Sequence, residues 1–274
     1  MTPLQQFIET HPRLFVLTGA GISTDSGIPD YRDRDGEWKR APPVTIQAFM
    51  QDPATRQRYW ARSLIGWPHF GRARPNPAHL ALAQLEHRGQ VELLVTQNVD
   101  RLHQRAGSER VIDLHGRLDE VRCMSCEWRL PRDAFQQQLI ERNPSWQHLD
   151  AVIAPDGDAD LVDQDFASFD VPPCPRCGGI AKPDVVFFGE GVPRERVEAA
   201  TRAWRAADAM LVVGSSLMVY SGYRFVQAAA NAGKPVAALT LGRTRADALL
   251  SLKIDANCSD ALAFLLTPER SIAN

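Results

Sequence analysis

The sequence predicts an α/β protein with a doubly wound, Rossmann-like parallel sheet into which a smaller module is inserted. Short apolar runs alternate with helix-like segments towards both ends of the chain, a pattern typical of parallel strands joined by crossover helices. A glycine turn directly follows the first apolar run, and two cysteine pairs interrupt the alternation in the middle. We therefore expect an α/β domain built from residues 1–116 and 182–274, with residues 117–181 as the inserted module.

Composition places the chain among ordinary globular proteins. Its 274 residues suffice for one large and one smaller domain, with 44% hydrophobic and 23% charged residues. The formal net charge of −2 argues against nucleic acid or an acidic membrane as partner. The first residues do not read as a signal peptide, and no apolar run approaches the roughly 18 residues of a membrane helix. The oligomeric state is left open.

The first strand and turn are predicted to form a phosphate cradle. Residues 14–17 are apolar and bulky, as in a buried parallel strand, and Thr18-Gly19-Ala20-Gly21 follows. Residues 23–26 can all cap a helix N-terminus, whose backbone N–H groups and positive dipole end attract anions. Thr24 takes the place of the third glycine of the dinucleotide fingerprint, so a plain βα turn remains an alternative.

The remaining elements follow from apolar periodicity and from glycine and proline positions. We expect an irregular, proline-marked segment over 39–53, part of a connection long enough to act as a lid or binding loop. The expected strands after the first are 91–95, 111–114, 184–188, 210–213 and 236–241. The expected helices are 4–10, 54–65 (ending at 66–68), 77–87, a short one at 102–104, 195–206 and 223–232.

The cysteines indicate a structural metal site. Cys123 and Cys126 form one C-x-x-C pair, and Cys174 and Cys177 form another. Two such pairs complete a tetrahedral four-thiolate zinc site, which is closed and therefore serves folding and not catalysis. Two redox dithiols are the alternative. Metal binding fits a reducing compartment, so we expect a cytoplasmic protein.

Polar residues follow several predicted strands. Gln97, Asn98 and Asp100 come directly after one strand and His115 ends the next, while Gly214-Ser215-Ser216 follows a third. Ligands of open parallel sheets sit at this edge, so these residues are candidates for a binding site. Asp100 could instead cap a helix, and a lone histidine is often structural. Neutral imidazole is also the side chain best suited to accept a proton near pH 7.

Together these motifs resemble the sirtuin family of NAD-dependent protein deacylases. The matching stretches occur in the family's order and are Gly19-Ala20-Gly21-Ile22-Ser23, Ser26-Gly27-Ile28-Pro29-Asp30-Tyr31-Arg32, Thr96-Gln97-Asn98-Val99-Asp100, His115-Gly116, both cysteine pairs, Val185-Val186-Phe187-Phe188-Gly189-Glu190 and Gly214-Ser215-Ser216. The ordered set is more specific than any one motif.

The resemblance implies a reaction and a role for each matching residue. NAD is consumed as co-substrate, the carbonyl oxygen of an acyl-lysine attacks its ribose, and nicotinamide and O-acyl-ADP-ribose are released. His115 is implied as general base, with Asn98 as the second catalytic residue, and Val186, Phe187, Gly189 and Glu190 are implied to pair with the substrate backbone. The implied NAD contacts are Gly19, Ala20, Gly21, Ser23, Thr24, Asp25, Gly27, Ile28, Pro29, Asp30, Tyr31, Arg32, Trp38, Gln97, Asn98, Val99, Asp100, Gly214, Ser215, Ser216, Thr240, Leu241, Gly242 and Cys258.

Several stretches are similar to the class II branch, which includes a mitochondrial sirtuin of animals. They are 56–62, 75–79, 154–158 and 220–225, and the branch carries an extra loop in its zinc module, here near 154–170. Tyr59 and Arg62 resemble a pair that recognises acidic acyl groups, although a surface helix charge is the alternative. Thr240-Leu241-Gly242 departs from the family pattern, and Cys258 could be an ordinary core residue.

The sequence is also compatible with two other functions. One keeps NAD but yields mono-ADP-ribosylated protein. The other is a zinc-ribbon adaptor on an α/β scaffold without catalysis. In the favoured interpretation the partners are acyl-lysine proteins or peptides, and residues 27–38 fold over NAD as a flap.

Overall fold

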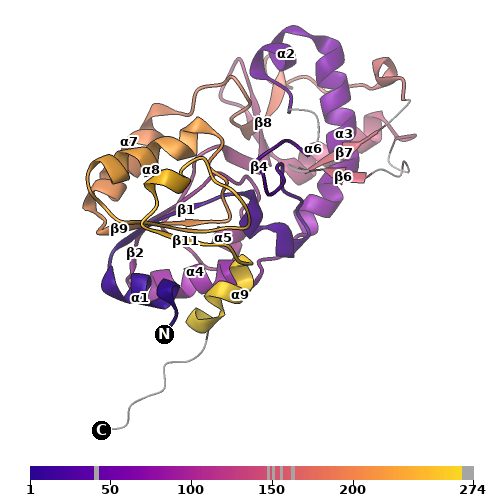
Figure 1. Cartoon of the computed structure of the whole chain (residues 1–274). Helices are drawn as coiled ribbons and strands as arrows, with labels where there is room; N and C mark the ends of the chain where they lie inside the picture. Colours follow the sequence, from indigo (N-terminus) through magenta and orange to yellow (C-terminus); the bar gives the residue numbers. More distant parts are fainter. Residues whose placement is uncertain (40–42, 147–148, 150–151, 155–156, 162–163, 267–274) are drawn as a thin grey trace.

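The structure is a computed structural model that describes residues 1–39, 43–146, 149, 152–154, 157–161 and 164–266. It has a larger part, built on a six-stranded sheet, and a smaller part that contains α3 and α6 (Figure 1). The residues near both termini belong to the larger part (Figure 1).

The main sheet is parallel and has the strand order β11-β10-β9-β1-β2-β3. The chain runs from β1 in the middle to one edge, then returns to β9 and builds towards the other edge. Ligands bind where the strand order reverses in this way, outside the carboxyl ends of the central strands. The strands are β1 (Leu14–Thr18), β2 (Val91–Thr96), β3 (Val111–Asp113), β9 (Ala209–Val213), β10 (Val236–Leu239) and β11 (Leu252–Ile254).

Helices cover both faces of this sheet (Figure 1). Side chains alternate along a strand, so Leu14 and Val16 pack on one face of β1 and Phe15 and Leu17 on the other. The first face is covered by α1 (Pro3–Thr10), α4 (Pro77–His87) and α9 (Cys258–Leu262), and the second by α7 (Arg194–Ala206) and α8 (Tyr220–Asn231). Both layers confirm the predicted doubly wound fold.

The smaller part is built on a three-stranded sheet of order β5-β4-β8. Its strands are β4 (Gly116–Cys123), β5 (Arg129–Pro131) and β8 (Ala181–Val185), joined by α6 (Arg132–Arg142), and β6 (Val152–Ala154) pairs with β7 (Asp158–Asp160). Residues far apart in sequence share its core, because Phe49 and Trp60 pack with Phe135 and Ala181. The helices α2 (Ile46–Gln51) and α3 (Pro53–Arg72) therefore belong to this core.

Two expectations for residues 39–68 were wrong. The segment expected to be irregular contains α2, capped by the Thr45 side chain, and the helix expected to end at 66–68 continues to Arg72. Pro68 lies inside α3 and cannot donate to the Leu64 carbonyl one turn earlier. The Gln136 side chain donates to that carbonyl at 2.8 Å instead, so tertiary contact compensates for the missing bond.

Two further expectations were also wrong. The strand expected at 184–188 to continue the parallel sheet is β8, which ends at Val185 and pairs antiparallel with β4. No α-helix begins at residues 23–26; two short 3₁₀ turns, Ala20–Ile22 and Thr24–Ser26, stand there. The terminal strand β11 was not foreseen, since Leu252–Ile254 is too short for a periodic signal. Four positions of the expected class II loop, 155, 156, 162 and 163, lie outside the described residues.

Among the described residues, none of the helices has the length and apolar character needed to cross a membrane.

Candidate active site and cysteine cluster

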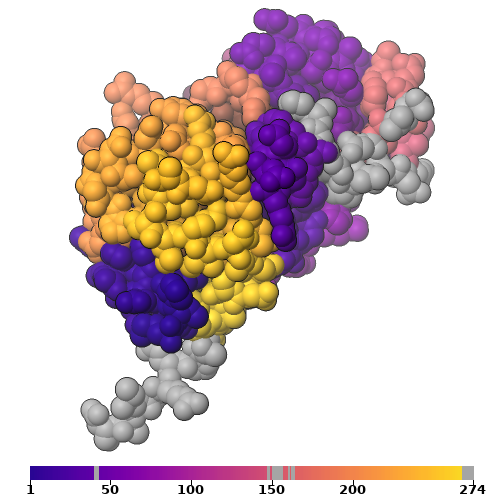
Figure 2. All heavy atoms as spheres, in the orientation of Figure 1, coloured from indigo at the N-terminus to yellow at the C-terminus, as the bar shows by residue number. Residues whose placement is uncertain are grey.

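A cavity of about 440 Å³ lies outside the carboxyl ends of β1, β2 and β9. This volume is within the usual range for small-molecule sites. One side is lined by loops of the main sheet, and the other by Phe70 of α3, the last residue of β8 and residues 186–190 that follow it. Figure 2 shows dark purple atoms from the N-terminal quarter of the chain at the boundary between the two parts.

The glycine turn after β1 packs backbone against backbone with the turn after β9. A Cβ on Gly19 would come within 2.8 Å of the Ser215 Cβ, and one on Gly21 within 2.9 Å of the Gly214 carbonyl oxygen. The N–H groups of Gly19 and Gly21 donate to the Val213 and Gly214 carbonyls at 3.2 and 2.8 Å. These two amides are therefore bonded within the protein and are not directed at a ligand, and the two glycines serve close packing of the cavity floor.

Asn98 and Asp100 belong to a polar network on the cavity wall. The Asn98 amide donates to the Gly19 carbonyl at 3.1 Å and to the Ser23 hydroxyl at 3.0 Å, and that hydroxyl donates to Asp100 at 2.7 Å. Burial raises the pKa of Asp100. Asp100 also accepts from the N–H of Leu102 at 2.9 Å, so it combines the capping role with a place in the cavity.

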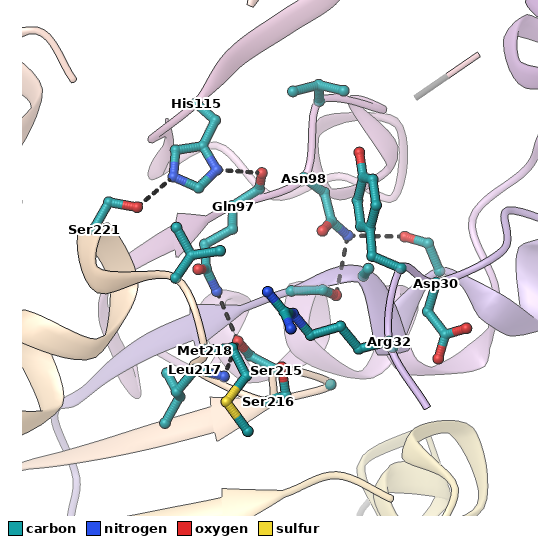
Figure 3. A pocket seen from close by; sticks show the side chains of 18 of the residues that line it. Asp30, Arg32, Gln97, Asn98, His115, Ser215, Ser216, Leu217, Met218 and Ser221 are labelled. Atoms are coloured by element: carbon teal, nitrogen blue, oxygen red, sulfur yellow. Dashed lines mark hydrogen bonds between the residues drawn. The ribbon is translucent and has the colours of Figure 1, made fainter. Parts of the chain in front are cut away.

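His115 is held at the cavity by Gln97 and Ser221. Its Nδ1 lies 3.0 Å from the Gln97 carbonyl oxygen and its Nε2 2.7 Å from the Ser221 hydroxyl (Figure 3). A carbonyl only accepts, so Nδ1 carries the hydrogen, and Nε2 of the neutral ring accepts from Ser221. Burial lowers the pKa of His115 to about 4, which keeps the imidazole neutral near pH 7.

The segment 28–39 forms another wall. The Arg32 guanidinium stacks 3.9 Å above the Trp38 ring, whose centroid lies 5.7 Å from that of Phe188. Lys39 pairs with Asp30 at 2.5 Å. These contacts connect the segment to the opposite side of the cavity at Phe188.

Residues 186–190 are fixed by a buried charge pair. Glu190 accepts from the Phe187 N–H at 2.9 Å and from the buried Lys182 ammonium at 3.0 Å. Phe188 is bridged to the chain before α2, because its carbonyl accepts from the Ile46 N–H at 2.9 Å. The exposed Phe188 side chain remains at the cavity.

The structure brings most of the candidate residues together. Lining the cavity are Gly19, Ala20, Gly21, Ser23, Ile28, Pro29, Asp30, Tyr31, Arg32, Trp38, Gln97, Asn98, Val99, Asp100, His115, Val186, Phe187, Gly189, Glu190, Gly214, Ser215, Ser216, Thr240 and Leu241. Seven candidates are not among its lining residues, namely Thr24, Asp25, Gly27, Tyr59, Arg62, Gly242 and Cys258.

Several of these seven residues have structural partners instead. Asp25 accepts from Asn257 and Ser259, which joins the 3₁₀ turn to α9, and burial raises the pKa of the Cys258 thiol to about 12. The Tyr59 ring packs 5.3 Å from that of Phe187. Arg62 forms an ion pair with Asp158 at 2.9 Å and donates to the Ala159 carbonyl at 2.7 Å. Its guanidinium is therefore already paired with a carboxylate of this chain.

Sequence reasoning missed several lining residues. Leu217, Met218 and Val219, in the loop from β9 to α8, and Tyr220 and Ser221, the first two residues of α8, line the cavity. Leu217 adopts a positive φ of 58°, which apolar periodicity does not reveal. The stretch 220–225 did carry a signal, because it matched the class II branch, but no role was assigned to Ser221.

The four paired cysteines meet at one point of the smaller part. Their sulfur atoms all lie within 4.8 Å of one another, with Cys123–Cys177 and Cys126–Cys177 both at 3.5 Å and Cys126–Cys174 at 3.7 Å. Four sulfurs at about 2.3 Å from a tetrahedral zinc lie about 3.8 Å apart. The Ser125 N–H also donates to the Cys123 sulfur at 3.3 Å, a hydrogen bond that favours the thiolate form. The donor set therefore fits one structural zinc.

An open α/β sheet with a cavity at its switch point is the architecture typical of nucleotide-binding proteins, and here it is combined with a four-cysteine cluster in the smaller part. A model of the Sir2 family matches residues 19–221, and the chain belongs to this family.

Relatives and solved structures agree with this assignment. An NAD-dependent protein deacetylase of Xanthomonas campestris is 70% identical over 97% of this chain and 90% of its own, and one of Bordetella bronchiseptica is 67% identical over 95% of each. Bovine NAD-dependent protein lipoamidase sirtuin-4 is 47% identical over 96% of this chain and 84% of its own, which supports the class II resemblance. A structure of Sir2 with a p53 peptide and NAD⁺ is 31% identical, with a TM-score of 0.75 and 97% of each chain covered.

Proposed function

We propose that this protein is an NAD-dependent protein-lysine deacylase that releases nicotinamide and O-acyl-ADP-ribose. The observation that carries the proposal is a neutral histidine, His115, whose Nε2 accepts a hydrogen bond at the wall of a nucleotide-sized cavity. NAD supplies an activated ribose when it is bound. The chain's own residues would supply the base, orient the ribose and bind the peptide.

In this proposal His115 is the general base. A base must have an unprotonated nitrogen within reach of the hydroxyl that it deprotonates. Nε2 meets this condition because the Gln97 carbonyl fixes the hydrogen on Nδ1. The proton removed from a ribose hydroxyl would pass to Nε2, and the resulting alkoxide would attack the acyl carbon. The bond between that carbon and the lysine nitrogen would then break, so that the acyl group stays on ADP-ribose and the lysine leaves as the free amine.

Asn98 and Asp100 would orient the ribose and the nicotinamide end. Their positions are fixed through Ser23, which accepts from Asn98 and donates to Asp100. Fixed polar groups lower the entropic cost of holding a reacting ring in a productive pose. Burial raises the pKa of Asp100, and its carboxyl oxygens accept from the Ser23 hydroxyl and the Leu102 N–H, so the carboxyl is held in one position at the cavity wall.

The segment 186–190 would pair with the peptide that carries the acyl-lysine. The charge pair between Glu190 and Lys182 holds this segment, and Phe188 presents an exposed aromatic side chain next to it. An extended peptide can add to such an edge through main-chain hydrogen bonds. The partners would then be acyl-lysine proteins.

The zinc would hold the smaller part in its fold through Cys123, Cys126, Cys174 and Cys177. A closed four-sulfur site leaves no position for substrate, so its contribution is to stability. Thiolate ligands require a reducing environment, and we propose the cytoplasm as the location.

The test is turnover of acyl-lysine peptides with NAD, followed by mass spectrometry. O-acyl-ADP-ribose would support the deacylase, whereas ADP-ribose attached to the protein would identify a mono-ADP-ribosyltransferase. A zinc-ribbon adaptor would show no NAD binding by calorimetry.

A further inference from the structure

The hydroxyl of Ser221 is hydrogen-bonded to Nε2 of His115, the nitrogen that must accept a proton in the proposed reaction. Ser221 Oγ lies 2.7 Å from Nε2, the usual length of a hydrogen bond donated by a hydroxyl (Figure 3). The opposite nitrogen is already bonded to the Gln97 carbonyl. The imidazole therefore has both of its polar atoms fixed by the protein before any substrate is present.

Ser221 is itself held in place from several sides. It is the second residue of α8, and Arg224 donates from Nε to its carbonyl at 3.1 Å. The next residue is Gly222, where a Cβ would come within 2.5 Å of the Gln97 Oε1. A side chain at this position would displace the Gln97 amide, so glycine allows the first turn of α8 and the Gln97 side chain to lie this close together.

Gln97 connects His115 to the loop that precedes α8. Its backbone carbonyl holds His115, and its side chain donates to Ser215 at 2.7 Å, in the loop that leads to α8. The same Ser215 hydroxyl accepts from the N–H of Leu217, the residue with positive φ, at 3.2 Å. A strained loop and a glycine thus place the Ser221 hydroxyl at Nε2.

We propose that Ser221 is a positioning residue for His115, whose hydroxyl keeps Nε2 directed into the cavity until a substrate hydroxyl replaces it. The proposal rests on the proposed function of His115 as a base. Ser221 lines the cavity beside His115, so an entering hydroxyl meets the serine and the imidazole together. When the serine rotates away, Nε2 is exposed at an orientation that is already set.

The proposal has a consequence for the protonation of His115. A hydrogen bond donated to Nε2 stabilises the neutral imidazole, because the protonated ring has no lone pair there. Arg224 of α8 and Arg196 of α7 act in the same direction through their charge, and the Gln97 carbonyl acts in the opposite direction. Removing the Ser221 hydroxyl therefore raises the proton affinity of Nε2, whereas a merely structural loss would leave it unchanged.

The experiment compares Ser221→Ala and Ser221→Thr with Ser168→Ala, which removes an exposed hydroxyl in the smaller part. The nitrogen resonances of the His115 ring are followed by NMR against pH in the zinc-loaded protein, with His115→Ala for assignment. The rate kcat/KM is measured over the same pH range.

In Ser221→Ala we expect the His115 titration and the acid limb of kcat/KM to move upward by roughly half to one pH unit, the size of one neutral hydrogen bond. We expect kcat to fall by about tenfold while KM for NAD changes little, and Ser221→Thr to restore both. Ser168→Ala should match the wild type.

A folded Ser221→Ala with unchanged His115 resonances and an unchanged acid limb would overturn the proposal. If Ser221→Ala does not fold, Ser221→Thr provides the test, because the proposal expects the threonine hydroxyl to keep the wild-type titration of His115. A folded Ser221→Thr whose His115 titration moves upward would contradict the proposal. Failure of the proposed function is distinguishable: the wild type would then release no nicotinamide, while the NMR titration would still report on the Ser221 contact.

Discussion

The backbone of Gly21 lies directly against that of Gly214, with the Gly21 N–H donating to the Gly214 carbonyl oxygen at 2.8 Å. This contact joins the turn after β1 to the turn after β9, across two neighbouring strands of the sheet. It forms the floor of the cavity, and its closeness depends on the absence of side chains at both positions.

Replacing Gly214 by alanine should damage both the fold and NAD binding. Gly214 has a φ of +64°, and a Cβ there would come within 2.2 Å of the Ile22 nitrogen. Gly233 has a similar φ of +73° but open space around it, so Gly233→Ala isolates the cost of the backbone conformation. We expect about 1–2 kcal/mol of lost stability for Gly233→Ala and at least about 3 kcal/mol for Gly214→Ala in urea denaturation. Equal losses in the two variants would contradict the close-packing argument.

Replacing His115 by alanine should remove turnover without removing the cofactor site. Loss of a general base costs about 10² to 10⁴ in rate. The Gly214 and Ser215 side of the cavity is not held by the imidazole, so NAD affinity measured by calorimetry should stay within about threefold of the wild type. Full turnover in a folded His115→Ala protein would refute the assignment of the base.

The buried His79 should make the protein less stable in acid. Its side chain is fully buried, and burial lowers its pKa from 6.5 to about 4. The unfolded chain therefore binds more protons between these two values, and stability falls as the pH falls below about 6.5. At pH 5 the loss from this group is about 2 kcal/mol relative to pH 7.5.

Urea denaturation at the two pH values tests this prediction. His79→Gln should lessen the acid-induced loss by about 2 kcal/mol. The control is His87→Gln, at an exposed position on the same helix, which should keep the wild-type difference. An undiminished loss in His79→Gln would show that other groups cause the acid sensitivity.

Removing a thiolate should release the metal and unfold the smaller part. Cys174→Ser is expected to lose the single zinc measured by mass spectrometry, since binding free energy of the metal is folding free energy of the module. Cys258→Ala keeps the four-sulfur cluster intact, because Cys258 lies in the core of the larger part, and should retain one zinc. Stoichiometric zinc in a folded Cys174→Ser would argue against the four-thiolate site.

The sequence predicts the larger part better than the smaller one, for physical reasons. Strands such as β1 are continuous apolar runs because both faces of the sheet are covered, and α4 has clear capping residues. Helix α3 was underestimated because Gln136, far away in sequence, satisfies the carbonyl that Pro68 leaves free. The strand at 184–188 was misassigned because an apolar run does not reveal which sheet it joins.

The same distinction applies to the site. Gln97, Asn98 and His115 were identifiable as polar residues following apolar strands. The glycines of the first turn were identified as part of the site, but their packing role was not, because their amides bond to a strand and turn that lie nearly 200 residues later. Ser221 was missed because its importance comes from its distance to His115, across a separation of 106 residues.

The central claim is tested most directly by turnover of acetyl-, glutaryl-, lipoyl- and long-chain acyl-lysine peptides with NAD, measured as nicotinamide released per acyl group lost. The account predicts that nicotinamide and O-acyl-ADP-ribose appear in equal amounts with at least one peptide, and that His115→Ala abolishes both. A folded, zinc-loaded, NAD-binding protein that releases no nicotinamide with any of these peptides would contradict it.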